Sequence, residues 1–295
     1  MAELHVARRP ALERPVLIAA FRGWNDGGQG ASLAGGYLAK LWDARRFAEI
    51  DSEGFFDFQS TRPHVRLEGG HTRKIDWPET VFHHARPDGL DRDTVLLLGV
   101  EPNLRWRTFS TLIVDFAREL GVELVVTLGA LLADVPHTRP VPVTGSATDS
   151  ELIEQLGLQA SRYEGPTGIV GVLHDACKQA GLKSASLWAA VPHYVSLAPS
   201  PKAAAALCER LGTLLGSPID TAELDRAADA YVTQVSDAIA SDEETAAYVE
   251  ELERRVDELD ESEIPSGETL AAELTRFLRE REEGEQDGPS GSSEH

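Results

Sequence analysis

The feature that most restricts how this chain can fold is a series of short, almost wholly apolar runs. They lie at residues 15–21, 94–100, 124–128 and 186–195. Strands that are apolar at consecutive positions are typical of a parallel sheet whose two faces are both covered. Because stretches of helical periodicity separate these runs, we expect a three-layer α/β/α fold with a mostly parallel sheet.

Helical patterns follow the apolar runs. Ser200 reads as an N-cap with Pro201 at the first helical position, and Thr148 with Glu151 forms a capping box that predicts another helix start. Elsewhere, short alternating segments, RKIDW and TVFHHAR, are split by Pro78 and predict an antiparallel hairpin or edge region. The helices themselves are expected over residues 28–43, 107–120 and 168–180, with another that begins after Ser200.

The chain divides by composition into four parts. We expect an N-terminal segment (1–14), an α/β/α core domain (15–216), a helical arm (217–263) and an acidic tail (264–295). The tail contains a weak helical pattern and then a polar, glycine-rich end, a composition typical of disorder.

The arm has apolar residues spaced three, four or seven positions apart. Ser217 and Pro218 predict its start, and a capping box of Ser241 and Glu244 predicts a break into two helices. Two alternatives stay open: a helical hairpin packed on its own domain, or an arm that binds another copy or a partner. The candidate interaction residues are Tyr231, Val235, Val249, Leu252, Val256 and Leu259.

Net charge is −21, and residues 242–295 hold 19 acidic and 5 basic residues. Such acidity argues against binding of nucleic acid or anionic membranes. The chain has no apolar run long enough for a transmembrane helix and no signal-peptide pattern at its start. Cys177 and Cys208 lie in apolar helical patterns, so we expect reduced core cysteines in a cytoplasmic protein.

A glycine-rich stretch, FRGWNDGGQG at residues 21–30, follows the first apolar run. Strand, glycine-rich turn and helix form phosphate-binding loops in many nucleotide-binding proteins. Here the Walker pattern lacks its lysine, because Gln29 and Gly30 stand where Lys and Ser or Thr belong, and the dinucleotide pattern fails at Leu33. A tight turn with positive φ and an anion-binding loop of another type both remain open.

Ligands of open parallel sheets bind beyond the carboxyl ends of the strands, so the polar residues there form a candidate ligand cleft. Each has a structural alternative: Asp26 can cap the next helix, and Glu101 with Arg105 can form a weak surface ion pair. We find no zinc spacing, nucleophile elbow or nucleotide-binding lysine, so we expect no metal and no cofactor. The candidates are Asn25, Asp26, Gly28, Glu101, Arg105, His137 and His193.

Several separated segments together resemble the actinobacterial branch of the proteasome assembly chaperone two family (PAC2 family). The resemblance runs from about Pro15 to Gly216, and the arm to about Asp260 is typical of that branch. The segments that carry it are FRGWNDGGQGAS, LLLGVEPNLRW, VTLGALLADVPHTRPVPVTGSATDSELIEQLGL, YEGPTGIVGVLHDACKQAGL and SLWAAVPHYV.

This resemblance implies a domain related in topology to nucleoside-phosphorylase-type folds. It also implies homo-oligomers and a link to proteasome subunits, since eukaryotic and archaeal relatives help to assemble the 20S proteasome. Chaperones of this class can dock a C-terminal hydrophobic–Tyr–any tail into proteasome pockets. This sequence ends in Ser293, Glu294 and His295, so we expect a different interface, such as the arm.

Two classes of function are therefore open. The first is a non-enzymatic, chaperone-like protein-interaction factor that forms homo-oligomers, with proteasome subunits as candidate partners. The alternative is a small-ligand-binding protein, or a hydrolase- or phosphorylase-like enzyme, that uses the cleft. We favour the first because nothing in the spacing of the candidate residues requires catalysis. One cavity enclosing all of them would favour the second.

Overall fold

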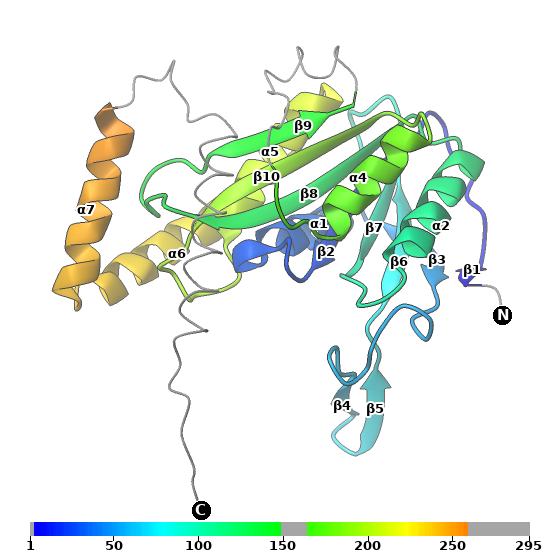
Figure 1. The fold of residues 1–295 in the computed structure, drawn as a ribbon, viewed down its shortest axis with the longest axis horizontal. Helices are drawn as coiled ribbons and strands as arrows, with labels where there is room; N and C mark the ends of the chain where they lie inside the picture. Colours follow the sequence, from blue (N-terminus) through cyan, green and yellow to red (C-terminus); the bar gives the residue numbers. More distant parts are fainter. Residues whose placement is uncertain (1–2, 149–163, 259–295) are drawn as a thin grey trace, which may run out of the picture.

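The computed structural model describes residues 3–148 and 164–258, and its centre is an eight-stranded sheet (Figure 1). The strand order is β1-β3-β6-β7-β2-β8-β10-β9. The strands are β1 (Leu4–Val6), β2 (Val16–Arg22), β3 (Arg45–Ile50), β6 (Thr80–Ala85), β7 (Thr94–Val100), β8 (Leu124–Ala133), β9 (Val143–Ala147) and β10 (Ser184–Pro192).

The four central strands, β7, β2, β8 and β10, run parallel to one another, as the apolar runs predict. The flanking strands β1, β3 and β6 on one side and β9 on the other pair antiparallel with their neighbours. β2 and β10 are almost wholly buried because helices cover both faces of the sheet. The sheet is therefore mixed, with a parallel centre.

Two layers of helices cover the sheet (Figure 1). One face carries α1 (Gly30–Leu41) and α5 (Pro201–Leu215), and the other carries α2 (Trp106–Glu119) and α4 (Ile169–Gln179). Alternate side chains of β2 enter the two resulting cores, because successive residues of a strand point to opposite faces. The predicted three-layer α/β/α architecture is confirmed.

The predicted start of α5 is also confirmed. The Ser200 hydroxyl accepts a hydrogen bond from the Ala203 N–H at 3.3 Å, and Pro201 opens the helix. The helix predicted from Thr148 through Glu151 falls on residues outside the described part of the chain.

The region of residues 62–86 pairs differently from the prediction. β4 (His64–Glu68) and β5 (Thr72–Asp76) form a two-stranded hairpin that projects from the main sheet (Figure 1). The segment with His83 and His84 was expected at a sheet edge, and this is wrong, because β6 lies between β3 and β7. The sequence of β3, RRFAEI, begins with two arginines, so its apolar pattern did not indicate the strand that covers β6.

The arm consists of α6 (Ala222–Ile239) and α7 (Glu243–Glu258), so the predicted break is confirmed. The capping residue of α7 differs from the prediction. Asp242 replaces Ser241 in that role, since its Oδ1 accepts hydrogen bonds from the N–H groups of Glu244 and Thr245 at 3.2 and 3.4 Å. Within residues 3–148 and 164–258, we find no helix long and apolar enough to cross a membrane.

The start of α6 also differs from the prediction. Ser217 and Pro218 resemble a cap and a first helical position, yet α6 begins at Ala222. The intervening residues cross α1, where the Asp220 carbonyl accepts a hydrogen bond from the Tyr37 hydroxyl at 2.7 Å. Ser217 instead belongs to the end of α5, because its N–H donates to the Gly212 carbonyl at 3.1 Å.

Candidate functional site

The glycine-rich turn after β2 passes through a short 3₁₀ segment (Gly27–Gln29) into α1. Asp26 Oδ1 accepts hydrogen bonds from Ala31 N at 2.9 Å and from Ser32 N at 3.1 Å. N–H groups at the start of a helix are the ones that bind phosphate in nucleotide-binding loops. Here the chain's own carboxylate occupies that position. Burial raises the pKa of Asp26 above its usual value.

Gly28 allows the backbone conformation and the close packing of the turn. Its φ of 54° lies in the left-handed region, and a Cβ there would lie 2.9 Å from Val191 Cγ1. Its carbonyl accepts a hydrogen bond from Ser200 N at 2.7 Å. Gly28 thus joins the turn after β2 to the start of α5.

Glu101, directly after β7, binds three groups from two other parts of the chain. Its Oε1 accepts hydrogen bonds from Asn25 Nδ2 and Ile169 N, both at 2.8 Å, and its Oε2 accepts one from Trp24 N at 3.1 Å. Ile169 is the first residue of α4, where a negative charge is favourable. The structure therefore brings Asn25, Asp26 and Glu101 together at the carboxyl ends of β2 and β7, in contacts that hold the fold.

Arg105 lies outside this network. Its guanidinium pairs with Glu3 at 2.6 Å and lies 5.2 Å from the centre of the Phe55 ring. The ion pair considered between Glu101 and Arg105 is thus replaced by one that fastens the N-terminal end of the described chain to the body.

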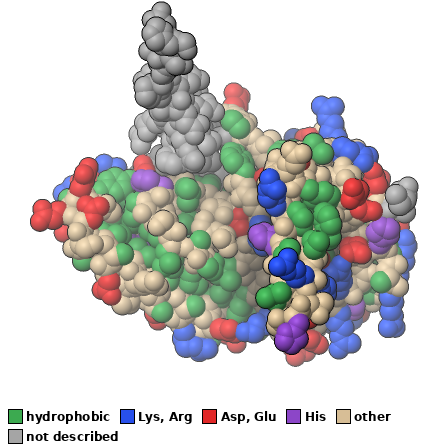
Figure 2. Space-filling model, turned by 90° about the horizontal axis from the view of Figure 1, so that it is seen from below, with side chains coloured by type: hydrophobic (Ala, Val, Ile, Leu, Met, Phe, Trp, Pro, Cys, Tyr) green, Lys and Arg blue, Asp and Glu red, His purple; other side chains and the backbone are tan. Residues whose placement is uncertain are grey.

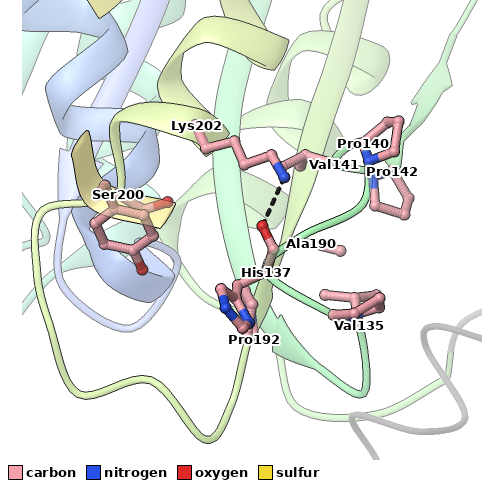
Figure 3. Close-up of a pocket in the computed structure, with 11 residues that line it drawn as sticks. Val135, His137, Pro140, Val141, Pro142, Ala190, Pro192, Ser200 and Lys202 are labelled. Carbon is pink, nitrogen blue, oxygen red and sulfur yellow. Dashed lines mark hydrogen bonds between the residues drawn. The ribbon is translucent and has the colours of Figure 1, made fainter. Parts of the chain in front are cut away.

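His137, in the loop after β8, belongs to a second group. Its N–H donates to Tyr194 Oη at 2.8 Å, while Nδ1 lies 2.9 Å from the same oxygen and Nε2 lies 2.9 Å from Ser236 Oγ in α6. Lys202 Nζ donates to the His137 carbonyl at 2.6 Å (Figure 3). Burial, and then the charge of Lys202, lower the pKa of His137. Both ring nitrogens have internal partners.

His193, after β10, extends the group that contains His137. Its Nδ1 lies 3.0 Å from Asp134 Oδ1. Its ring packs edge-on against Tyr194 and against Tyr248 of α7, with centroids 5.8 and 5.7 Å away. The two histidines are thus linked through Tyr194, away from the carboxylates at the ends of β2 and β7.

The cavity beside His137 is small (Figure 3). Its lining includes prolines, Val135, Val141 and Lys202. The volume that the centre of a water-sized sphere can occupy inside it is about 10 Å³. That is room for about one water molecule, whereas ligand pockets commonly measure about 300–1,000 Å³. This cavity does not accommodate a metabolite.

A larger open groove, of about 330 Å³, lies beside α1 and the β2–β7 pair. β2 leads to α1 on one face and β7 leads to α2 on the other, so the groove lies where open sheets commonly bind ligands. Arg22, Ser32 and Glu79 supply polar groups, with Leu33 and Leu98 among the apolar ones. It is lined by none of the seven candidate cleft residues.

The sequence model of the PAC2 family matches residues 20–239. The chain belongs to the PAC2 family. A proteasome-assembly chaperone homologue from Mycobacterium tuberculosis is 49% identical, with a TM-score of 0.73 over 79% of this chain and 99% of the other. A PAC2 family protein from Streptomyces avermitilis is also 49% identical, with a TM-score of 0.73 over 80% and 99% of the two chains. A search of curated proteins found no match.

A more distant solved structure shows the same fold. PbaB from Pyrococcus furiosus, an archaeal proteasome activator, is 21% identical, with a TM-score of 0.63 over 80% of this chain and 97% of PbaB. At that identity the likeness concerns the fold alone. The resemblance inferred from the sequence motifs is confirmed by the family match and by the two actinobacterial structures.

The arm of this PAC2 protein packs against its own chain. Four of its candidate interaction side chains are buried, one is half-buried, and Leu259 lies outside the described residues. These apolar groups are therefore not an open docking surface in this conformation. The buried ones are Tyr231, Val235, Val249 and Leu252, and the half-buried one is Val256.

Polar contacts hold α7 to the loop after β8. Arg139 forms a two-pronged ion pair with Asp257, at 2.6 and 2.8 Å, and lies 3.4 Å from Glu253. The Thr138 hydroxyl also donates to Glu253. Arg139 and Thr138 lie in one of the segments that carried the PAC2 resemblance, so that segment positions the arm.

The sequence analysis did not identify three residues of this PAC2 protein that the structure places near the candidate residues or at the carboxyl edge of the sheet. Lys202 gave no signal, because it reads as an ordinary residue in the first turn of α5. Trp24 and Leu104 were also missed, although they lie in the loops after β2 and β7 and are 46% and 47% exposed. The sequence did contain a signal for them. A large apolar residue in a polar loop at the carboxyl edge of a sheet has no core to pack into, so it is expected to be exposed.

Proposed function

We propose that this PAC2-family protein is a non-enzymatic, chaperone-like protein-interaction factor that works in the cytoplasm. The observation that carries the proposal is that polar groups of the expected cleft are hydrogen-bonded to other groups of the protein. Asp26 caps α1, Glu101 accepts three hydrogen bonds from the protein, and both nitrogens of His137 have internal partners. Groups committed in this way hold the edge of the sheet in place and have little capacity left for catalysis.

The docking surface in this proposal is the carboxyl edge of the central strands. Trp24 and Leu104 are large apolar side chains that keep nearly half of their surface exposed there. Glu101 accepts a hydrogen bond from the Trp24 N–H at 3.1 Å, so less backbone entropy is lost there on binding. Trp is among the residue types that most often dominate the binding energy of protein interfaces.

Proteasome subunits are the proposed partners. A protein that is 49% identical is described as a proteasome-assembly chaperone homologue, and this is the reason for naming them. The cytoplasmic setting is supported by two buried free thiols, Cys177 and Cys208.

The test is recovery of proteasome α- and β-subunits by the purified, tagged full chain from an actinobacterial host, at low and high salt. We expect assembly intermediates to be recovered with the native chain, and binding to fall at least tenfold for Trp24→Ser and Leu104→Ser. Leu41→Ser is the matched control, because Leu41 is 38% exposed at the other end of α1. Equal losses in all three variants, or no recovery with the native chain, would contradict the proposal.

One observation favours the second function, binding of a small ligand. The groove beside α1 has the volume of a ligand pocket, and Arg22 and Ser32 line it together with Leu33 and Leu98. A thermal-shift screen of small carboxylates and phosphates tests it, with Arg22→Gln as the control. A ligand that stabilises the native chain, and not the variant, would support this second function.

A further inference from the structure

Two loops form the carboxyl edge around Trp24 and Leu104, one after β2 (residues 23–29) and one after β7 (residues 101–105). They begin side by side, because the Glu101 N–H donates to the Arg22 carbonyl at 2.8 Å. The connection from β3 to β6, which carries the β4–β5 hairpin, lies at the same edge, since β3 and β7 run in the same direction. Figure 1 shows this hairpin below the sheet, and Figure 2 looks at the molecule from that side, where hydrophobic and basic side chains occur together.

The charged groups at this edge differ in their partners. The carboxylates of Asp26 and Glu101 accept hydrogen bonds from the starts of α1 and α4, and Arg105 is paired with the N-terminal end of the described chain. Arg22, the last residue of β2, and Arg107, in the first turn of α2, are exposed and form no ion pair with any described residue. The charge of Arg22 acts to lower the pKa of Asp26, but burial has the larger effect and raises it. Among these five groups, the two unpaired charges are thus both positive.

The two unpaired arginines can bind carboxylates from outside the chain. Elsewhere in this acidic protein, Arg14, Arg46 and Arg86 each contact two carboxylates. A positive charge is unfavourable at the start of a helix, and the first turn of α2 contains no acidic residue to balance Arg107, so helix stability does not explain its position. A guanidinium group forms two-pronged hydrogen bonds with a carboxylate. Arg22 and Arg107 therefore offer two binding points for acidic side chains of a partner.

The groove beside α1 adjoins this edge. Arg22 lines the groove and also leads into the turn that carries Trp24. Leu33 and Leu98 give the groove apolar walls, and its volume of about 330 Å³ leaves room for a large side chain. Gly36 keeps it open, since a Cβ at that position would meet no atom within 4 Å. A segment that lies across Trp24 can therefore place an apolar side chain in the groove.

We propose that the partner binds this edge through an acidic segment that carries a large apolar side chain. The inference rests on the proposed docking function and adds the chemistry of the segment that docks. The apolar side chain occupies the groove beside α1, and carboxylates of the same segment pair with Arg22 and Arg107. Glu79 is the one carboxylate that lines the groove, and it is already paired with Arg46 at 3.1 Å.

The charge of the whole protein favours a short acidic segment over other negative partners. Nucleic acids and anionic membranes extend over large distances, and the net charge of −21 repels them. A short segment meets mainly the charges close to it, because interactions beyond about 8 Å are largely screened at physiological salt. The local arginines then decide whether the segment binds.

Fluorescence anisotropy at physiological salt tests the charge preference. The probes are two labelled peptides with the same central Leu-Phe pair, flanked by glutamates in one peptide and by lysines in the other. We expect the glutamate peptide to bind the full native chain at least tenfold more tightly, and to lose at least tenfold in affinity when Arg22→Gln and Arg107→Gln are combined. Arg226→Gln is the matched control, because Arg226 is exposed on α6 and unpaired among the described residues. Equal affinity for the two peptides, no binding of the glutamate peptide, or its displacement by a short oligothymidylate would overturn the proposal.

Filling the groove tests where the apolar side chain binds. Gly36→Leu should keep the fold, since leucine is a good helix former and the Cβ meets open space, and its side chain should block the groove. We expect this variant to bind the glutamate peptide at least tenfold more weakly, whereas Gly36→Ala, which adds one methyl group, should bind it like the native chain. Circular dichroism checks that both variants are folded. Unchanged binding in Gly36→Leu would overturn the proposed placement.

Recovery of proteasome subunits separates this inference from the proposed function. We expect the combined Arg22→Gln and Arg107→Gln variant to recover at least tenfold less of the subunits than Arg226→Gln does. Recovery that is lost in Trp24→Ser and unchanged in the arginine variant would overturn the acidic segment and leave the docking function standing. Recovery that is unchanged in Trp24→Ser would contradict the docking function itself.

Discussion

The carboxylate of Asp26 provides the sharpest test of the role of the glycine-rich turn. Replacing it by Ala removes the acceptor of two backbone N–H groups at the start of α1, one of which belongs to the fully buried Ala31. Loss of an N-cap costs about 0.5–2 kcal/mol, and a buried N–H left without a partner costs about 1–3 kcal/mol. These effects overlap, so we expect Asp26→Ala to lower the free energy of unfolding by about 2 kcal/mol.

Asp26→Asn separates the cap from the charge. The amide oxygen can still accept both hydrogen bonds, and burial raises the pKa of Asp26, which means that the site disfavours the ionised form. Asn should therefore be at least as stable as Asp at pH 7. As the pH rises from 3.8 through the raised folded-state pKa, the unfolded chain loses its proton first, so the native chain loses stability in that window. The Asn variant should lack this contribution.

Urea unfolding followed by circular dichroism gives the three stabilities. Each is measured with and without inorganic phosphate. In Asp26→Ala the freed N–H groups form an anion site, so phosphate should recover part of the lost stability. The reasoning fails if Ala unfolds at the native midpoint, if Asn is as destabilised as Ala, or if phosphate stabilises the native chain as much as the Ala variant.

Three further outcomes are expected. Gly168→Ala should lower the free energy of unfolding in urea by about 1–3 kcal/mol, because the added Cβ would lie 2.1 Å from a side-chain atom. Gly36→Ala, where the Cβ meets open space, should raise the free energy of unfolding by about 0.5–1 kcal/mol. Equal effects of the two substitutions would contradict this prediction. Because burial lowers the pKa of His137, stability should fall as the pH drops below 6.5, and less steeply in His137→Gln. Burial raises the pKa of the Cys177 and Cys208 thiols to about 12, so both should react with a thiol reagent only after unfolding; rapid labelling of the native chain would exclude this burial.

The sequence predicted those parts of the fold that depend on local patterning. Continuous apolar runs indicated the parallel strands β2, β7, β8 and β10, and the cap at Ser200 indicated α5. β3 and β9 were missed, because RRFAEI and VTGSA lack an apolar pattern and are strands through pairing with their neighbours. The start of α6 was predicted wrongly from Ser217 and Pro218, because Ser217 closes the end of α5 through a hydrogen bond to Gly212.

The candidate cleft was predicted only in part. The rule for parallel sheets indicated one cleft for all seven candidate residues, whereas the structure joins Asn25 to Glu101 beside Asp26 and places Arg105, His137 and His193 in other contacts. Whether a carboxylate binds a ligand or the backbone depends on which N–H groups face it, and these come from remote segments such as Ile169. Spacing in the sequence does not contain that information. The exposure of Trp24 follows likewise from the packing of the surrounding loops.

The position of β2 in the sheet has a consequence for synthesis of the chain. Val16 pairs with Thr94 on one side and with Leu124 on the other, so both neighbours of this first central strand emerge from the ribosome much later. Translation proceeds at about 5–20 residues per second, so the apolar side chains and backbone groups of β2 stay uncovered until β7 and β8 have been synthesised. Non-local pairing of this kind folds slowly and invites aggregation. A protein proposed to assist the assembly of others therefore has an early strand that depends on protection during its own synthesis.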